Sequence, residues 1–265
     1  MMLSNMKKIL CCIIFLSAVL QAQESFESFD QTKIAFTDTG SGIPVILIHG
    51  FISSGDSWKY SLLAKDLVDI GYRVIIPDLR GNGLSDRPQE AGFYANDAEI
   101  NDLKALADFL KLKSYLAVGY SRGAIVLSKL LIDEPRIEKA VLGGMGLDFT
   151  NPDWSRRIMF QKAFSGEEPP NDITEGAIKY AKSIGADLKV LGYLQEYQPV
   201  TSIKELNTIK AKVLVIAGDQ DKDNGDPKEL SKQIPGAFCK IVPGTHNDTK
   251  NTAAFSNEVI SFLMK

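Results

Sequence analysis

The stretch LAVGYSRGAIV, residues 116–126, constrains the fold most, because an apolar run ends there in a serine between two glycines. The residues from Tyr115 to Val118 are continuously apolar, which is typical of a short buried strand. From Ser121 to Asp133, apolar residues recur at helical spacing. The serine therefore stands at a strand-to-helix junction. Side chains at positions 119 and 123 would collide there with the neighbouring strand and helix, which accounts for Gly119 and Gly123.

The same alternation of apolar runs and helical segments extends along most of the chain. Strands are expected at residues 33–37, 45–48, 73–76, 115–118, 137–142, 212–217 and 238–242. Helices are expected at residues 57–70, 96–110, 121–133, from 227 onward and at about 252–264. In the first of these helices one face is expected to carry the buried residues Trp58, Leu62, Leu63, Leu67 and Ile70. Strands alternating with helices predict an α/β protein with a mostly parallel, eight-stranded type of sheet flanked by helices.

The alternation stops between residues 148 and 205, where helical stretches are interrupted by prolines 152, 169, 170 and 199. We interpret 148–205 as a helical cap inserted into a core formed by 23–147 and 206–265. Its large side chains are expected to form the cap's own core and its contact with the main domain, and some must face a pocket: Trp154, Met159, Phe160, Phe164, Tyr180, Leu191, Tyr193 and Leu194. Which of them face the pocket stays open, so substrate-binding residues are not assigned.

The N-terminus has the pattern of a secretory signal peptide. Lys7 and Lys8 precede an apolar run from Ile9 to Leu20 that only Ser17 interrupts, and a small residue follows at Ala22. We expect residues 1–22 to be cleaved near Ala22 and the protein to be exported, either to a periplasm or out of the cell. An uncleaved membrane anchor is the alternative, although the run is short for a spanning helix.

Charge and cysteine content bear on the partners of the protein and on disulfide bonds. The chain has a net charge of −3, and loss of residues 1–22 removes two lysines and no acids, which gives −5. Basic residues are scattered, so no nucleic-acid partner is expected. Only Cys239 would remain after cleavage, so an intramolecular disulfide is excluded. No membrane contact is expected of the cleaved chain.

The segment Gly119-Tyr120-Ser121-Arg122-Gly123 resembles the nucleophile elbow of the α/β-hydrolase fold family. Four more segments resemble this family in the right order. They are the oxyanion loop His49-Gly50-Phe51, the turn PDLRGNGLSD at 77–86, the acid strand and loop VLVIAGDQD at 213–221, and the histidine loop PGTH at 243–246. The resemblance covers residues 26–147 and 206–265.

The resemblance implies a serine carboxylesterase-like enzyme with a short helical cap. Ser121 would be the nucleophile, His246 the base and Asp221 the acid of a catalytic triad. The backbone N–H groups of Phe51 and Arg122 would stabilise the oxyanion. The expected substrate is a small or medium acyl ester, cleaved through an acyl-enzyme, with no metal ion or organic cofactor.

Several roles keep alternatives. Asp219, Asp223 and Asp148 compete with Asp221 as the acid. The chain has two histidines, and His49 is more simply a structural, hydrogen-bonded residue of the oxyanion loop. The side chain of Arg122 either forms an ion pair with a nearby acid or binds an anionic substrate.

The activity also keeps alternatives, because one triad serves several reactions on this fold. Thioesterase, lactonase, carbon–carbon bond hydrolase and perhydrolase activities stay open, as does a ligand-binding protein without turnover. The serine at the elbow argues against a dehalogenase or an epoxide hydrolase, since those relatives place an aspartate there.

Overall fold

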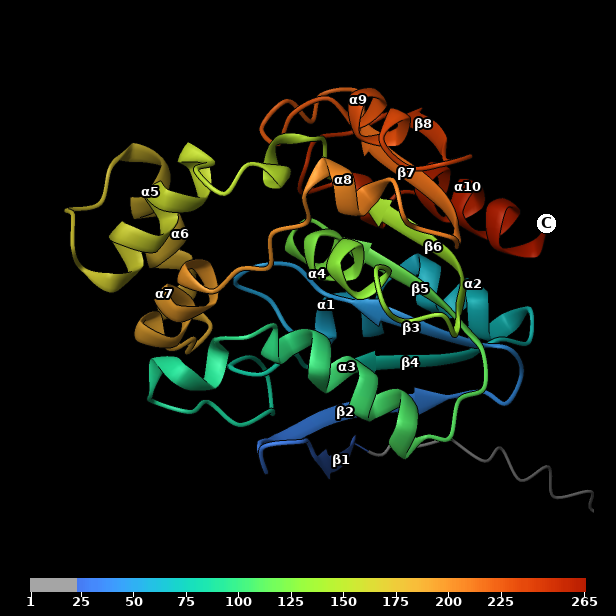
Figure 1. Cartoon of the computed structure of the whole chain (residues 1–265), viewed down its shortest axis with the longest axis horizontal. Coiled ribbons are helices and arrows are strands. Elements are labelled where there is room, and N and C mark those ends of the chain that lie inside the picture. The colour runs from blue at the N-terminus through green and yellow to red at the C-terminus, as the bar shows by residue number, and fades with distance from the viewer. Residues whose placement is uncertain (1–22) are drawn as a thin grey trace, which may run out of the picture.

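The computed structural model describes residues 23–265, so the expected signal peptide lies outside the described residues. Eight strands form one sheet in the order β1-β2-β4-β3-β5-β6-β7-β8 (Figure 1). The strands are β1 (Gln23–Glu27), β2 (Lys33–Thr39), β3 (Pro44–Ile48), β4 (Arg73–Pro77), β5 (Tyr115–Tyr120), β6 (Ile137–Gly143), β7 (Lys212–Gly218) and β8 (Phe238–Val242). β2 runs antiparallel to both β1 and β4, and the other neighbouring pairs are parallel. The predicted mostly parallel sheet is confirmed.

Ten helices occur in the described residues, and some of them cover the two faces of this sheet. They are α1 (Asp56–Lys59), α2 (Leu62–Asp69), α3 (Ala98–Phe109), α4 (Arg122–Leu130), α5 (Ser155–Ser165), α6 (Asp172–Ser183), α7 (Leu188–Glu196), α8 (Ile203–Leu206), α9 (Pro227–Lys232) and α10 (Ala253–Met264). Three short 3-10 turns are η1 (Ala91–Tyr94), η2 (Asp148–Thr150) and η3 (Thr249–Asn251). Among the described residues, no helix is both long and apolar enough to cross a membrane.

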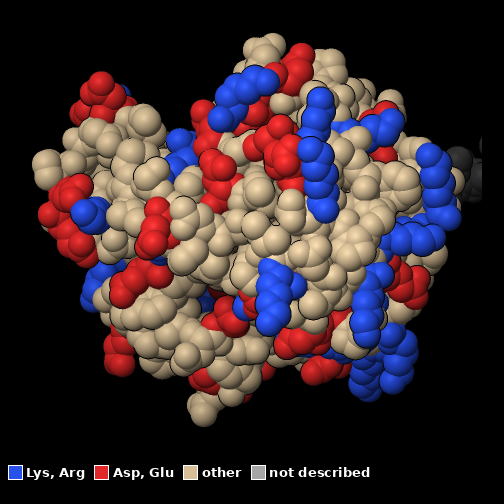
Figure 2. All heavy atoms as spheres, turned by 45° about the horizontal axis from the view of Figure 1, so that its top comes forward, with Lys and Arg blue, Asp and Glu red and all other residues tan. Residues whose placement is uncertain are grey.

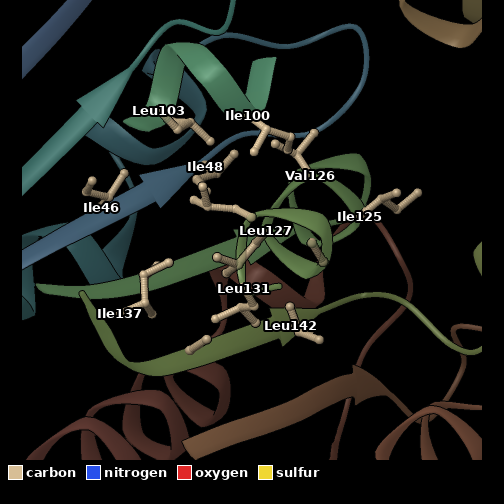
Figure 3. Close-up of a cluster of buried hydrophobic side chains, with 14 of the residues drawn as sticks. Ile46, Ile48, Ile100, Leu103, Ile125, Val126, Leu127, Leu131, Ile137 and Leu142 are labelled. Atoms are coloured by element: carbon tan, nitrogen blue, oxygen red, sulfur yellow. The ribbon is translucent and has the colours of Figure 1, made fainter. Parts of the chain in front are cut away.

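The apolar residues of each parallel strand divide between two core layers, because successive side chains point to opposite faces. Ile46 and Ile48 of β3 pack in the layer that holds α3 and α4, as the close-up in Figure 3 shows. Val45 and Leu47 pack on the other face, against residues of α1, α2 and α10. Burial on both faces explains why these strands read as unbroken apolar runs.

The helix expected over residues 57–70 is interrupted, and this prediction was wrong in part. α1 ends at Lys59, and Ser61 then caps α2 by accepting a hydrogen bond from the backbone N–H of Ala64 at 3.2 Å. The break changes the helical phase. Trp58, Leu63 and Leu67 are fully buried as expected, whereas Leu62 and Ile70 are exposed.

The segment 148–205 contains η2, α5, α6 and α7, and its expected end falls inside the short helix α8. α5, α6 and α7, hereafter the cap helices, lie beyond the carboxyl ends of the parallel strands (Figure 1). They share a small apolar cluster that includes Phe164, Leu191 and Leu194. Figure 2 shows acidic and basic side chains interspersed on the face in view, without a continuous basic surface.

Candidate active site

Ser121 occupies a strained turn between β5 and α4. Its backbone has φ 55° and ψ −126°, a conformation that L-residues rarely adopt and that costs about 1–3 kcal/mol. Its N–H donates to the carbonyl of Gly143 on β6 at 2.8 Å, which ties the turn to the sheet. The turn projects the serine beyond the carboxyl edge of the sheet at the start of a helix.

The two glycines that flank this turn are required by close backbone contacts. A Cβ on Gly119 would lie 2.3 Å from the carbonyl oxygen of Gly123. A Cβ on Gly123 would lie 2.3 Å from the carbonyl oxygen of Ile48 and 2.6 Å from that of His49. The predicted collisions with helix and strand are confirmed, and the strand in question is β3.

The structure brings Ser121, His246 and Asp221 together. His246 Nε2 lies 2.9 Å from Ser121 Oγ, and its Nδ1 lies 2.7 Å from Asp221 Oδ2. The serine follows β5, the aspartate follows β7 and the histidine follows β8. Because parallel strands end at the same edge, loops that are distant in sequence meet there.

Of the four aspartates considered from the sequence, Asp221 is the one that contacts the imidazole of His246. Asp219 Oδ1 instead accepts from the N–H of Gly244 at 3.0 Å, and Asp223 lies near a cap arginine. Asp148 Oδ1 packs against the backbone of Gly225.

One of the two side-chain oxygens of Asp221 bonds to the histidine, and the other is unpaired among the described residues. The side chain is buried, and its Oδ1 has no hydrogen-bond partner within residues 23–265. The bond from His246 Nδ1 to Asp221 Oδ2 orients the imidazole ring toward Ser121.

Two contacts around His246 were not predicted. The hydroxyl of Tyr120 donates to the carbonyl of His246 at 2.8 Å, and burial raises the pKa of Tyr120, which keeps this donor protonated. Asn224 Nδ2 lies 3.1 Å from His246 Nδ1 and donates to the carbonyl of Gly144 at 3.3 Å. Tyr120 was visible in the elbow motif, but only as an unspecified residue. No sequence pattern points to Asn224.

Two backbone N–H groups expected to bind an oxyanion are available beside Ser121. Arg122 is the first residue of α4, so its N–H has no partner within the helix. The N–H of Phe51 makes no hydrogen bond to any residue that the structure describes. The loop that carries Phe51 passes close to the serine, since a Cβ on Gly50 would lie 3.3 Å from that of Ser121.

His49 has the structural role that its place in the loop suggested. Its Nε2 accepts from the N–H of Leu79 at 3.0 Å, which leaves the proton on Nδ1 to donate to the carbonyl of Gly50 at 2.9 Å. Burial lowers the pKa of His49, so the ring stays neutral. It holds the loop of Phe51 against the turn that follows β4.

The side chain of Arg122 forms a buried ion pair and is not aimed at a substrate. Its Nη1 and Nη2 donate to the two carboxylate oxygens of Glu99 on α3 at 2.7 and 2.6 Å. Nη2 also donates to the carbonyl of Leu194 on α7 at 2.8 Å. Of the two alternatives for this arginine, the ion pair is the one observed.

Two neighbouring hollows are both lined by Ser121 and His246. The larger has a volume of about 610 Å³ and the smaller about 100 Å³, and Phe51, Arg156 and Phe160 border both. We refer to them together as the cleft. Among the large cap residues, Trp154, Phe160 and Tyr180 line it, whereas Phe164, Leu191 and Leu194 form the cap's own core. Within residues 23–265 no cluster of three or more His, Cys, Asp or Glu side chains could hold a metal ion.

Comparisons with known proteins bear on the fold and the family of this chain. The sequence pattern of the alpha/beta hydrolase fold matches residues 43–176. A protein named non-heme haloperoxidase from Rhodococcus erythropolis is 37% identical and aligns with 88% of this chain and 97% of its own length. A putative non-heme chloroperoxidase from Synechocystis is 29% identical over 88% of this chain and 96% of its own.

Solved structures of other proteins share the fold of this chain. A bromoperoxidase from Bacillus anthracis superimposes with a TM-score of 0.71 at 26% identity, over 92% of this chain and all of its own. An esterase from Exiguobacterium antarcticum has a TM-score of 0.75 at 20% identity, over 91% of this chain and 99% of its own, which shows a shared fold. On fold, motif order and sequence similarity, this chain belongs to the α/β-hydrolase fold family.

Proposed function

We propose that the protein is a serine hydrolase that cleaves small or medium acyl esters through an acyl-enzyme. The observation that carries this proposal is the hydrogen-bonded series from Ser121 Oγ through His246 to Asp221, held at a strained turn that opens onto the cleft. A nucleophile within hydrogen-bond reach of a base, which a carboxylate in turn orients, is the arrangement that acyl transfer requires.

In the first half of the reaction, His246 Nε2 takes the proton of Ser121 as Oγ attacks the ester carbonyl carbon. Asp221 holds the ring with its proton on Nδ1 and stabilises the imidazolium that forms. The carbonyl oxygen becomes an oxyanion, which the N–H groups of Phe51 and Arg122 would stabilise. Each such donor is worth about 3 kcal/mol of barrier. Collapse of the intermediate breaks the ester bond, and His246 returns the proton to the departing alkoxide.

In the second half, water attacks the acyl-enzyme while His246 takes its proton. The new tetrahedral intermediate releases the carboxylic acid, and Oγ regains a proton from the imidazolium. Only neutral His246 can act as the base in either half of the reaction.

The similarity to proteins named haloperoxidases supports a second candidate, a perhydrolase. Hydrogen peroxide would replace water in the second half, attack the acyl-enzyme and leave as a peroxycarboxylic acid. Release of peracid from an ester and peroxide, measured as bromide-dependent halogenation of a dye, separates this activity from plain hydrolysis. The candidate would be rejected if peroxide leaves the product entirely as the ordinary acid.

The first test is hydrolysis of 4-nitrophenyl acetate and butyrate by residues 23–265, beside the variant Ser121→Ala. Loss of the nucleophile should lower kcat by about 10³-fold to 10⁶-fold. A fluorophosphonate probe should label the parent on Ser121 and leave the variant unlabelled. Equal rates and equal labelling would show that another group performs the reaction, and saturable ligand binding without turnover would favour a binding protein.

We further propose that residues 1–22 are a secretory signal and that the enzyme acts outside the cytoplasm. The support is the sequence pattern of two lysines, an apolar run and a small residue at Ala22. N-terminal sequencing of the exported protein should find Gln23 or a neighbouring residue. Recovery of Met1 or Met2 at the mature terminus would instead indicate an uncleaved anchor.

A further inference from the structure

The cleft carries a charge opposite to that of the chain. The whole protein has 33 acidic and 30 basic residues. Yet every fixed charge among the described residues that border the cleft is cationic: Arg122, Arg156, Arg157 and Lys250. In a partly water-excluded cleft such charges act more strongly than on an open surface. A ligand can bind only to those of the four that are not already bonded to acceptors within the protein.

Two of these cations are already committed to acceptors within the protein. Arg122 is bonded to both carboxylate oxygens of Glu99. Arg157 Nη1 and Nη2 donate to the backbone carbonyls of Gln195 and Pro152 at 3.0 and 2.6 Å. Arg122 also bonds to Leu194 on α7, and both acceptors of Arg157 lie within the segment 148–205, so both guanidinium groups are already used within the protein.

Arg156 on α5 is differently placed. Its guanidinium lies over the ring of Phe160, with Cζ 5.4 Å from the ring centroid, so the ring fixes its direction. Its one ion-pair partner among the described residues is Asp223. The distance from Arg156 Nη2 to Asp223 Oδ2 is 3.6 Å, which is longer than a good hydrogen bond, and the side chain of Asp223 is 59% exposed. Exposed pairs of this kind contribute about 0–1 kcal/mol, so a substrate anion can compete for the guanidinium.

Lys250, in η3, also borders the larger hollow, and its ammonium lies 5.3 Å from the centroid of the Trp58 ring. Its Nζ donates to the carbonyl of Ser57 at 2.9 Å and to Asn251 Oδ1 at 3.2 Å, which uses two of its three N–H bonds. Within residues 23–265 no carboxylate lies within ion-pair distance of it. Burial lowers the pKa of Lys250, as expected for a desolvated ammonium that no acid stabilises.

We propose that the cleft selects esters that carry a carboxylate, and that Arg156 and Lys250 bind this group. The proposal rests on the hydrolase function above and names its substrate class. A planar guanidinium donates two parallel N–H bonds to a carboxylate, and a partly buried ammonium gains most from an anion that offsets its desolvation. One cation comes from the cap and the other from the main domain, so the substrate anion would contact both parts of the molecule.

The test is a comparison of kcat/KM for two matched pairs of esters. The first pair, 4-acetoxybenzoate and its methyl ester, places the carboxylate in the leaving group. The second, mono-4-nitrophenyl adipate and 4-nitrophenyl hexanoate, places it in the acyl group. The ratio of anionic to neutral ester should fall about tenfold or more in Arg156→Gln or Lys250→Met, recover in part in Arg156→Lys, and weaken with added salt in the parent.

Lys162→Gln is the matched control for the loss of charge. Lys162 lies on the same helix as Arg156, pairs with Glu168 at 2.6 Å and does not border the cleft. This variant should keep the parent ratio. The affected pair of esters then shows whether the carboxylate belongs to the acyl group or to the alcohol.

The outcomes separate this proposal from the hydrolase function. Turnover of all four esters, with ratios that neither Arg156→Gln nor Lys250→Met changes, overturns the anion site and leaves the hydrolase standing. Absence of turnover overturns the hydrolase, and calorimetry then decides on the anion site. Adipate should bind Ser121→Ala at least tenfold more tightly than it binds Ser121→Ala/Arg156→Gln, and equal affinities would reject the site.

Discussion

The turn around Ser121 and the cap helices border the same cleft, but different kinds of contact hold them in place. Backbone meets backbone at the turn: Gly123 packs on the carbonyls of Ile48 and His49, and Ser121 N–H bonds to Gly143. The cap helices are held by side chains, through their own apolar cluster and through Arg122, which bonds to Glu99 and also donates to the carbonyl of Leu194 on α7. Backbone contacts leave almost no choice of residue, whereas side-chain packing tolerates many.

This difference explains how one fold can serve many substrates. The residues that would break the bond lie on a frame that admits few substitutions. The residues that would choose the substrate, such as Arg156 and Phe160, come from helices whose packing can be rebuilt. Four predictions test this contrast, beginning with the largest effect.

Gly123→Ala should abolish folding or lower the free energy of unfolding by at least about 3 kcal/mol, because the new Cβ meets two backbone oxygens that cannot move aside. Gly176→Ala on α6 is the matched change in the cap. Its Cβ would meet nothing within 4 Å, so it should raise stability by about 0.5–1 kcal/mol. Urea unfolding of both variants measures the contrast, and similar values for the two would contradict it.

Arg122→Met should destabilise the protein by about 3–5 kcal/mol, since it leaves the buried carboxylate of Glu99 without its partner. The double variant Arg122→Met/Glu99→Met removes both charges and should recover most of this loss. A double-mutant cycle of urea midpoints gives the coupling. If the two single losses simply add, the ion pair does not hold this part of the molecule together.

Phe160→Ala should cost only about 1–2 kcal/mol of stability, because the ring is half-buried and its main contacts are the rings of Phe51 and Phe164. It should raise KM for 4-nitrophenyl butyrate more than it lowers kcat, since Phe160 lines the cleft and touches none of the reacting atoms. A fall in kcat at constant KM would show instead that the cap helps to organise the catalytic groups.

His49 should give the smallest effect, a loss of stability in mild acid. Its pKa is lowered in the folded state from the ordinary 6.5, so the unfolded chain takes up the proton first. Its contribution is therefore complete above pH 6.5 and is lost as pH falls through the lower folded value. Urea midpoints from pH 7 to pH 5 should decline less steeply in His49→Gln than in the parent, and parallel curves would exclude His49 as the cause.

Sequence patterns predicted seven of the eight strands and the three side chains that the structure brings together, because both depend on local rules. Buried parallel strands read as apolar runs, and the elbow needs its glycines wherever it occurs. β1 was missed because, in QESFE, Phe26 is the single buried residue of an edge strand. The phase change at Ser61 was also missed, since a capping serine inside an apolar pattern looks like one exposed position of a longer helix.

The lining of the cleft could not be predicted, for a physical reason. Arg156 and Arg157 are neighbours on one helix, yet one faces the cleft with a weak partner and the other bonds to backbone carbonyls. That distinction depends on how α5 sits against the main domain, and no local pattern encodes it. The same holds for Asn224 and for Lys250, whose surroundings are assembled from segments distant in sequence.

The bond from Arg122 to the carbonyl of Leu194 affects which substitutions α7 can accept within the family. The acceptor is main chain, so any side chain can occupy position 194 without loss of the bond. Side chains of α7 can therefore change without loss of this bond, while a shift of the helix itself leaves a buried donor unpaired at a cost of about 1–3 kcal/mol. This bond therefore constrains the position of α7 more than it constrains the side chain at position 194, and that side chain can change without disturbing Arg122, the neighbour of Ser121.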